Sequence, residues 1–216
     1  NSQNRFVTSR IRGRGHTTDD DAATEQHETI RTSDSCAMVP AAQYRSNPRF
    51  IEMLQKDNDD PIPPQVAAVA REVEVSWDIA VRAAKVLGVN PELVEALQLV
   101  RYTSPEAEYQ LHHDHGKFYE KTTEHRPWTM LIFLNDVVDA GGHTGFPKLE
   151  LEVIPRGGDA LIWSNVIQTG GEVDEDMVHM GKPPTTEEVE KYAVNVWFGE
   201  DTLDGRIARG EFGEWS

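Results

Sequence analysis

The chain has 216 residues and a mass of 24.3 kDa, the size of one domain with a substantial core. Its formal net charge of −16 argues against nucleic acid as a partner, because no basic stripe is present to neutralise phosphates. No run approaches the roughly 18–20 apolar residues of a membrane span, so none is predicted. Cys36 is the only cysteine, which excludes a disulfide within the chain.

The N-terminal part, residues 1–30, is polar, and we expect a mobile loop or an edge hairpin there. The chain begins at Asn1 without an initiator methionine or a targeting signal, so we expect it to be part of a longer protein. Residues 31–33 are predicted to form a short strand.

An amphipathic helix is predicted over residues 65–87. Its apolar residues recur every three or four positions and form one stripe that we expect to pack against a sheet: Val66, Val69, Val73, Trp77, Ala80, Ala84 and Leu87. Gly88 is expected to end this helix, and Asn90 and Pro91 suit the start of a second, short one.

After Glu95 the sequence changes to short apolar segments separated by Gly, Pro and Asp. We predict strands at residues 97–102, 109–115, 128–134, 149–154, 160–163, 177–179 and 192–198. Many short strands after a helical region indicate a β-sandwich. Residues 201–216 read as a polar tail.

Three residues form a candidate metal site. His112 and Asp114 are two positions apart, so on a strand both side chains point to the same side, and His179 follows far downstream. Two histidines and one carboxylate are the facial ligand set of non-haem Fe(II), which leaves positions open for a co-substrate and O2. His113 and His115 have the opposite parity, and we expect them to point away from the iron.

Further motifs follow these ligands in order. They are Gly141-Gly-His-Thr-Gly-Phe-Pro147, Pro155-Arg-Gly-Gly-Asp-Ala-Leu-Ile-Trp163, His179-Met-Gly-Lys-Pro183 and Lys191-Tyr-Ala-Val-Asn-Val-Trp197. Together with the His-x-Asp pair, they resemble the catalytic domain of prolyl 4-hydroxylases, which are Fe(II)- and 2-oxoglutarate-dependent dioxygenases. The likeness runs from about residue 31 to residue 197. It implies a single α+β, mostly β domain over residues 1–216, with a double-stranded β-helix (jelly roll) core buttressed by N-terminal helices.

The resemblance also implies roles for residues around the metal. Lys191 stands where the family uses a lysine to bind the far carboxylate of 2-oxoglutarate, with Tyr102 and Thr144 as further candidates for that carboxylate. Phe133 replaces a tyrosine that is common in the family. Arg126 and Trp197 are candidate substrate contacts, although Arg126 could instead form a local salt bridge and Trp197 could belong to the core.

By the same resemblance, the expected reaction is hydroxylation of peptidyl proline to 4-hydroxyproline. Fe(II), 2-oxoglutarate and O2 are then required, succinate and CO2 are co-products, and ascorbate is the expected reductant. The expected partner is a proline-containing peptide or protein. The alternatives are a dioxygenase that acts on another residue or a small molecule, and a non-catalytic jelly-roll binding module. Members of the family occur in the endoplasmic reticulum or the cytoplasm, and the sequence predicts neither the compartment nor the oligomeric state.

Overall fold

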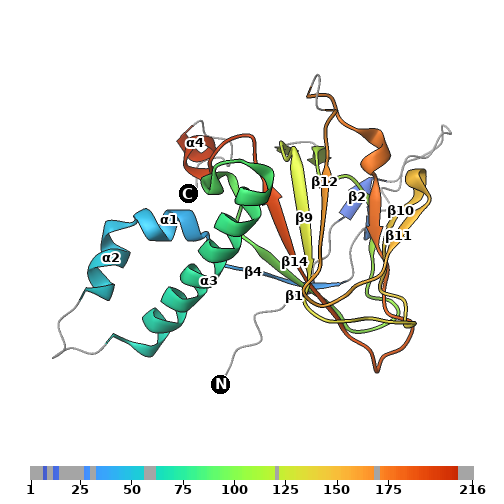
Figure 1. Ribbon diagram of the computed structural model, residues 1–216, viewed down its shortest axis with the longest axis horizontal. Helices are drawn as coiled ribbons and strands as arrows, with labels where there is room; N and C mark the ends of the chain where they lie inside the picture. The colour runs from blue at the N-terminus through green and yellow to red at the C-terminus, as the bar shows by residue number, and fades with distance from the viewer. Residues whose placement is uncertain are drawn as a thin grey trace.

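The computed structural model describes residues 33–55, 62–119, 122–167 and 171–208, together with three short N-terminal strands. Its helical segments are α1 (Ala41–Ser46), α2 (Pro48–Leu54), α3 (Pro64–Leu87), α4 (Leu203–Ala208) and the 3-10 turns η1 (Pro91–Leu93), η2 (Pro147–Leu149) and η3 (Glu175–Met177). Figure 1 shows α1, α2, α3 and α4 on one side of the β-structure, with α3 as the longest of them.

The strands that carry the fold lie after α3. They are β5 (Gln98–Tyr102), β6 (Tyr109–His112), β9 (Trp128–Phe133), β10 (Thr144–Phe146), β11 (Leu151–Val153), β12 (Ala160–Ser164), β13 (His179–Gly181) and β14 (Lys191–Phe198). The other strands are β1 (Val7–Thr8), β2 (Arg12–Arg14), β3 (His27–Thr29), β4 (Asp34–Ala37), β7 (Gly116–Tyr119) and β8 (Thr122–Glu124).

Within the described part of the chain, the eight strands that carry the fold lie in two antiparallel sheets, the larger of which is extended by β1 and β4. The larger sheet has the order β1-β4-β5-β14-β9-β12, and the smaller has the order β11-β10-β13-β6. When the eight strands are counted in chain order, one sheet reads 1-8-3-6 and the other 5-4-7-2. This interleaving is that of a jelly roll, and it confirms the predicted fold. In Figure 1 the larger sheet lies between the helices and the smaller sheet.

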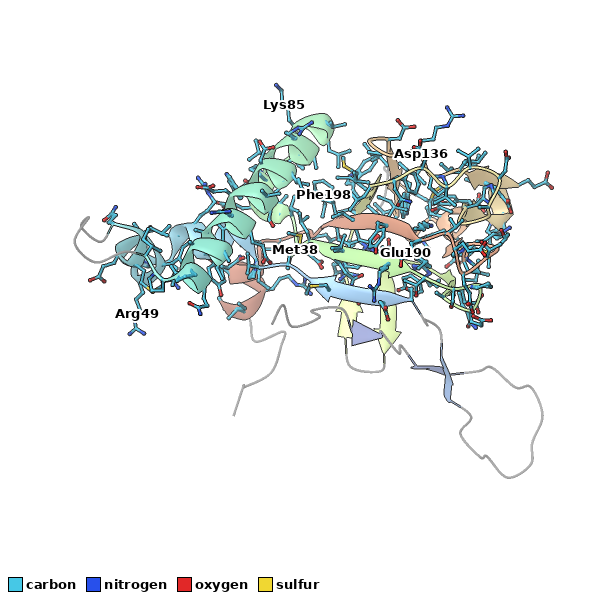
Figure 2. The ribbon with its side chains drawn as sticks, turned by 90° about the horizontal axis from the view of Figure 1, so that it is seen from below. Met38, Arg49, Lys85, Asp136, Glu190 and Phe198 are labelled. Carbon is cyan, nitrogen blue, oxygen red and sulfur yellow. The ribbon has the colours of Figure 1, made fainter. Side chains whose placement is uncertain are left out.

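β14 joins the helical layer to the interior of the roll, because successive side chains of a strand point to opposite faces. Its even-numbered residues Val194, Val196 and Phe198 pack in a cluster that includes Ala83 and Ala84 of α3. The small alanine side chains let the helix approach the sheet closely. Phe198 is 1% exposed and lies on the side of the sheet that faces α3 (Figure 2).

The predicted helix is confirmed within one residue. Pro64 occupies a first-turn position, where its missing N–H removes no hydrogen bond, and Gly88 ends the helix with a left-handed φ of 70°. Val73, Ala80 and Ala84 of the expected stripe are buried. Lys85, on the opposite face, points away from the body of the protein (Figure 2).

Several predicted boundaries were wrong. The strand expected at 109–115 ends at His112, and Asp114 lies in a bend after it. The strand expected at 149–154 shrinks to β11, because Glu150 adopts a positive φ of 52° after the turn η2.

Other elements were not predicted. Helices α1 and α2, the strand β10 and the paired strands β7 and β8 were missed, and the predicted polar tail includes α4. The strand predicted at 31–33 begins at Asp34 instead, and residues 31 and 32 lie outside the described residues.

The N-terminal expectation concerns mostly undescribed residues. Of residues 1–30, the structure describes β1, which pairs with β4, and the antiparallel pair of β2 and β3. The remaining residues of that range, and residues 209–216 of the tail, lie outside the described residues. No helix in the described ranges is both long and apolar enough to cross a membrane.

Phe198 provides a test of the contact between α3 and the sheet. Phe198→Ala should lower the free energy of unfolding by about 3–5 kcal/mol, since it removes a fully buried aromatic ring and leaves a cavity. Urea denaturation followed by circular dichroism measures this loss. The matched control is Val86→Ala on α3, where the valine is 66% exposed and the expected change is within about 0.5 kcal/mol. Equal effects of the two changes would contradict this account of the core.

Candidate active site

The three predicted metal ligands meet in the interior of the roll. His112 is the last residue of β6 and His179 the first of β13, and their Cα positions are paired across the two strands. Asp114 follows in the bend and turns back toward both rings. Its carboxylate oxygens lie 3.6 Å from His112 Nε2 and 3.6 Å from His179 Nε2. All three side chains are buried, at 9%, 2% and 5% exposure for His112, Asp114 and His179.

The second nitrogen of each ring fixes the orientation of the two histidines. His112 Nδ1 lies 2.7 Å from the Gln110 carbonyl oxygen, and His179 Nδ1 lies 2.9 Å from the Met177 carbonyl oxygen. Each Nδ1 can donate a hydrogen bond to its carbonyl oxygen. Each Nε2 then carries a free lone pair on the side of the ring that faces Asp114. This backbone support is typical of metal-ligating histidines.

Aromatic rings pack around the same two imidazoles. Tyr109 stacks on His112 with a centroid distance of 3.5 Å, and Trp163 meets His179 edge-on at 4.8 Å. Burial lowers the pKa of His179, which favours the neutral imidazole that binds metal, although the nearby Asp114 opposes this shift.

Asp114 is held by a chain of buried hydrogen bonds. Thr129 Oγ1 donates to Asp114 Oδ2 at 2.8 Å, and Asn165 Nδ2 donates to Thr129 Oγ1 at 2.8 Å. Burial alone would raise the pKa of the Asp114 carboxyl. The nearby His179, His112 and Arg126 together with the Thr129 hydrogen bond nevertheless hold this pKa below its usual value. Asp114 is therefore a carboxylate when it meets a cation.

This arrangement fits a divalent ion. The donor atoms of His112, Asp114 and His179 all lie within 4.8 Å of one another. Two ligand atoms that each lie about 2.1 Å from one ion are between about 3 Å and 4.2 Å apart, depending on the angle at the ion. Small movements of the three side chains would bring all their ligand atoms within these separations. Two imidazoles and one carboxylate on one side leave the remaining positions open, as Fe(II) oxygen chemistry requires.

The triad opens into a pocket that also contains Lys191. Tyr102 and Lys191 are direct cross-strand partners on β5 and β14. The side chains that line the pocket are those of Val100, Tyr102, Tyr109, His112, Asp114, Leu131, Thr144, Trp163, His179, Lys191, Ala193, Asn195 and Trp197, with Gly181 completing the wall. The structure thus brings six predicted site residues besides Lys191 into one cavity: His112, Asp114, His179, Tyr102, Thr144 and Trp197.

Lys191 is buried at 1% exposure, and among the described residues no carboxylate pairs with it. Its ammonium lies 4.7 Å from the centre of the Tyr102 ring and 6.0 Å from that of Phe133. Burial lowers the pKa of Lys191 to about 7. Thr144 Oγ1 is also buried and has no hydrogen-bond partner among the described residues. The two groups offer a cation and a hydroxyl to an anionic ligand.

Of the two candidate substrate contacts, Trp197 lines the pocket and Arg126 does not. Arg126 forms a bidentate ion pair with Glu95, at 3.0 and 2.7 Å, and its guanidinium lies 4.1 Å from the centre of the Trp197 ring. Trp197 Nε1 is buried without a hydrogen-bond partner in the described part of the chain. The Arg126 guanidinium therefore packs on a tryptophan of the pocket wall and does not line the pocket itself.

His113 and His115 do not join the triad. His113 Nε2 lies 3.0 Å from the Asp174 carbonyl oxygen, and its Nδ1 accepts from the His115 N–H at 3.0 Å. His115 lies in a separate cluster with His125 and Glu200.

Several residues of the site were not predicted from the sequence. Asn165 is fully buried and supports Asp114 through Thr129, and Asn195 reaches the pocket from β14. Gly181 was also missed: a Cβ there would lie 2.5 Å from the Tyr102 hydroxyl oxygen. The alternation of β14 could have revealed Asn195, since it has the same parity as Lys191. No local pattern indicates Asn165.

Comparison with known proteins agrees with this site. Residues 97–199 match the family model described as the 2OG-Fe(II) oxygenase superfamily. A protein of Acanthamoeba polyphaga mimivirus named as a prolyl 4-hydroxylase is 30% identical over 157 residues, covering 69% of this chain and 57% of the viral protein. Prolyl 4-hydroxylase subunit alpha-1 of Gallus gallus is 31% identical over 128 residues, covering 56% of this chain and 24% of the subunit. The chain thus spans little more than half of the first relative and about a quarter of the second.

Similar solved structures were also found. The viral collagen prolyl hydroxylase of Paramecium Bursaria Chlorella virus-1, in its complex with 2-oxoglutarate, has a TM-score of 0.49 at 22% identity. That match covers 59% of this chain and 74% of the other.

The support for Asp114 leads to a prediction about metal affinity. Thr129→Val keeps the shape of the side chain but removes the hydroxyl that donates to Asp114, and we expect the triad to bind Fe(II) about 10- to 100-fold more weakly. Anaerobic competition with a chelator measures the change. Thr185→Val, at an exposed threonine, is the matched control and should bind as the unaltered protein does. An unchanged affinity in Thr129→Val would show that this hydrogen bond does not tune the carboxylate.

Proposed function

We propose that the protein is an Fe(II)- and 2-oxoglutarate-dependent dioxygenase that hydroxylates peptidyl proline, because residues 97–199 match the family model of the 2OG-Fe(II) oxygenase superfamily. The observation that carries the proposal is the pairing, in one buried pocket, of the His112–Asp114–His179 triad with an unpaired lysine ammonium. The triad suits Fe(II), and the lysine suits an anion that reaches into the same cavity.

The reaction joins two oxidations. One atom of O2 enters 2-oxoglutarate, which becomes succinate and CO2, and the other enters a C–H bond of proline, which becomes 4-hydroxyproline. When bound, the iron supplies the activation of O2. The residues of this chain hold the ion, place the co-substrate and keep water out of the pocket. Ascorbate is the proposed reductant.

Lys191 is proposed to bind the far carboxylate of 2-oxoglutarate. A buried ammonium without a counter-charge is costly, so the pocket favours an anion at this position. The Thr144 hydroxyl, unpartnered among the described residues, can donate to the same carboxylate, and Tyr102 lies over the lysine. Phe133 contributes only carbon at the position where relatives carry a tyrosine, so the lysine has to provide more of the binding.

The peptide is proposed to enter on the side of Trp197. Trp197 lines the pocket and its buried Nε1–H has no partner among the described residues, so it can donate to a substrate carbonyl. Arg126, which is ion-paired with Glu95, packs its guanidinium against the ring of Trp197. In this arrangement Arg126 is a positioning residue.

The proposed substrate is tested with proline peptides. Incubation with Fe(II), 2-oxoglutarate and O2 should add the mass of one oxygen atom to a proline, and amino-acid analysis should identify 4-hydroxyproline. His112→Ala, Asp114→Ala and His179→Ala should each abolish this product, whereas His113→Ala should retain most of it. The peptide set includes collagen-like, hydroxyproline-glycoprotein-like and single-proline sequences.

Other outcomes separate the alternatives. Succinate release that depends on free amino acids, with no proline peptide hydroxylated, would leave the dioxygenase but exclude the proline substrate. The absence of any 2-oxoglutarate turnover by the iron-loaded protein would indicate a binding module.

Lys191 provides the sharpest test of the co-substrate. Lys191→Ala leaves the carboxylate of 2-oxoglutarate buried without its cation, at a cost of roughly 3–5 kcal/mol. This corresponds to an affinity about a hundred- to several-thousand-fold weaker, measured by titration of 2-oxoglutarate into the metal-loaded protein without O2. Iron binding should change little, because no metal ligand is altered. An unchanged 2-oxoglutarate affinity would place the anchor elsewhere.

Lys191→Arg is the matched control for charge. Because the pKa of Lys191 is about 7 in the empty pocket, binding of an anion above that pH requires uptake of a proton. The affinity of the unaltered protein should therefore fall as the pH rises above 7, by up to about tenfold per pH unit. Arginine remains charged and should show no such dependence, although its planar group restores only part of the affinity.

A further inference from the structure

A second cluster of metal-binding side chains lies apart from the pocket. His115, His125 and Glu200 each offer one ligand atom, and these atoms lie within 4.8 Å of one another. None of the three lines the pocket that holds the triad. We propose that this cluster is a second metal site, which takes a late divalent transition-metal ion such as Zn²⁺.

The backbone places the two histidines opposite each other. Strands β7 and β8 are antiparallel, and Gly116 is paired with Glu124. Continuing this register by one residue sets His115 across from His125, at the open end of the two-stranded sheet. Directly opposed residues have Cβ atoms about 4.5–5.5 Å apart, which is close enough to share an ion. The two rings accordingly meet edge to face, with their centroids 5.7 Å apart.

Glu200 is brought to the same point by the end of β14. Its N–H donates to the His125 carbonyl oxygen at 3.1 Å, and the neighbouring Gly199 N–H donates to the Leu93 carbonyl oxygen at 2.8 Å. The Glu200 carboxylate lies 3.6 Å from His125 Nδ1. Because these hydrogen bonds join the two backbone segments, the residues that carry the carboxylate and the second imidazole are neighbours before any ion binds.

His115 is also fixed by its surroundings. Its N–H donates to His113 Nδ1, and His113 contacts the Asp174 carbonyl oxygen through its other ring nitrogen. The His115 ring forms a hydrogen bond with the backbone of Arg126. His115 Nδ1 is nevertheless buried without a hydrogen-bond partner among the described residues. A buried polar atom left unpaired is unfavourable, and an ion in the cluster would supply this ring with a further partner.

The ligand types favour zinc over the hard cations. Two imidazoles and one carboxylate bind Zn²⁺ in sites that keep a fourth position for water, whereas Ca²⁺ and Mg²⁺ prefer oxygen ligands. The side chains of His125 and Glu200 are 50% and 54% exposed, so an ion can enter from solvent. The net charge of −16 attracts cations to the surface in general.

An ion at this position would connect three separate segments. It would join the bend after β6, the segment between β8 and β9, and the end of β14. The base of the β7–β8 pair would then be tied to the strand that carries Lys191 and Trp197. Because His115 directly follows Asp114, the proposed site and the triad share one stretch of backbone.

The test is a titration of the metal-free full chain with Zn²⁺ alone, by calorimetry and by elemental analysis after removal of unbound metal. The unaltered protein should bind two equivalents. His112→Ala should lose one and keep the other. His125→Ala and Glu200→Gln should weaken the second equivalent at least 100-fold and leave the first unchanged, since removal of a direct ligand costs more than the loss of outer support. Circular dichroism confirms that each variant is folded.

The control variant is His143→Ala, which removes a histidine that belongs to neither cluster and should still bind two equivalents. A protein that binds one equivalent, lost in His112→Ala, would overturn the second site. So would a second equivalent that persists in both His125→Ala and Glu200→Gln. The experiment needs no turnover, so its result is independent of the proposed activity.

Discussion

The alternation of side chains along β14 is the constraint on which the rest of the structure depends. Its even-numbered residues anchor the sheet to α3, and its odd-numbered residues Lys191, Ala193, Asn195 and Trp197 line the pocket. A shift of one residue in the register would exchange the two sets, placing the lysine against the helix and valines in the cavity. The hydrophobic contact with α3 therefore also determines where the buried cation lies.

A buried cation requires space as well as a ligand, and two glycines provide it. A Cβ at Gly142 would lie 3.6 Å from Lys191 Cδ and 3.0 Å from Val137 Cγ1, and the φ of Gly142 is 71°. At Gly181, a Cβ would meet the Tyr102 hydroxyl at 2.5 Å. These glycines do more than reverse the chain: they let Tyr102 and Lys191 occupy the interior side by side. The glycine motif near residue 142 is thus part of the pocket as well as a turn.

The sequence predicts the parts of the site that depend on the periodicity of apolar residues and on the order of the motifs along the chain. The helix of residues 64–87 follows from its stripe, His112 from strand parity, and Lys191 and Trp197 from the resemblance to the family. Asp114 was predicted for an incomplete reason, because the strand ends at His112 and a bend carries the carboxylate inward. The partner of Arg126 is Glu95, 31 residues away, and that of Thr129 is Asn165, 36 residues away. Such pairs depend on how the sheets fold together, and no local pattern encodes them.

The bend after β6 shows how adjacent residues can serve different sides of the protein. Asp114 turns into the roll toward His112 and His179, whereas His115 turns outward toward His125 and Glu200. His113, which lies between the end of β6 and Asp114, connects the bend to the Asp174 carbonyl oxygen through its ring Nε2. The inner carboxylate is held by the Thr129 hydrogen bond, and the outer imidazole lies across from His125 in the register of the β7–β8 pair. One bend therefore supplies the inner triad and the proposed outer site with no side chain in common.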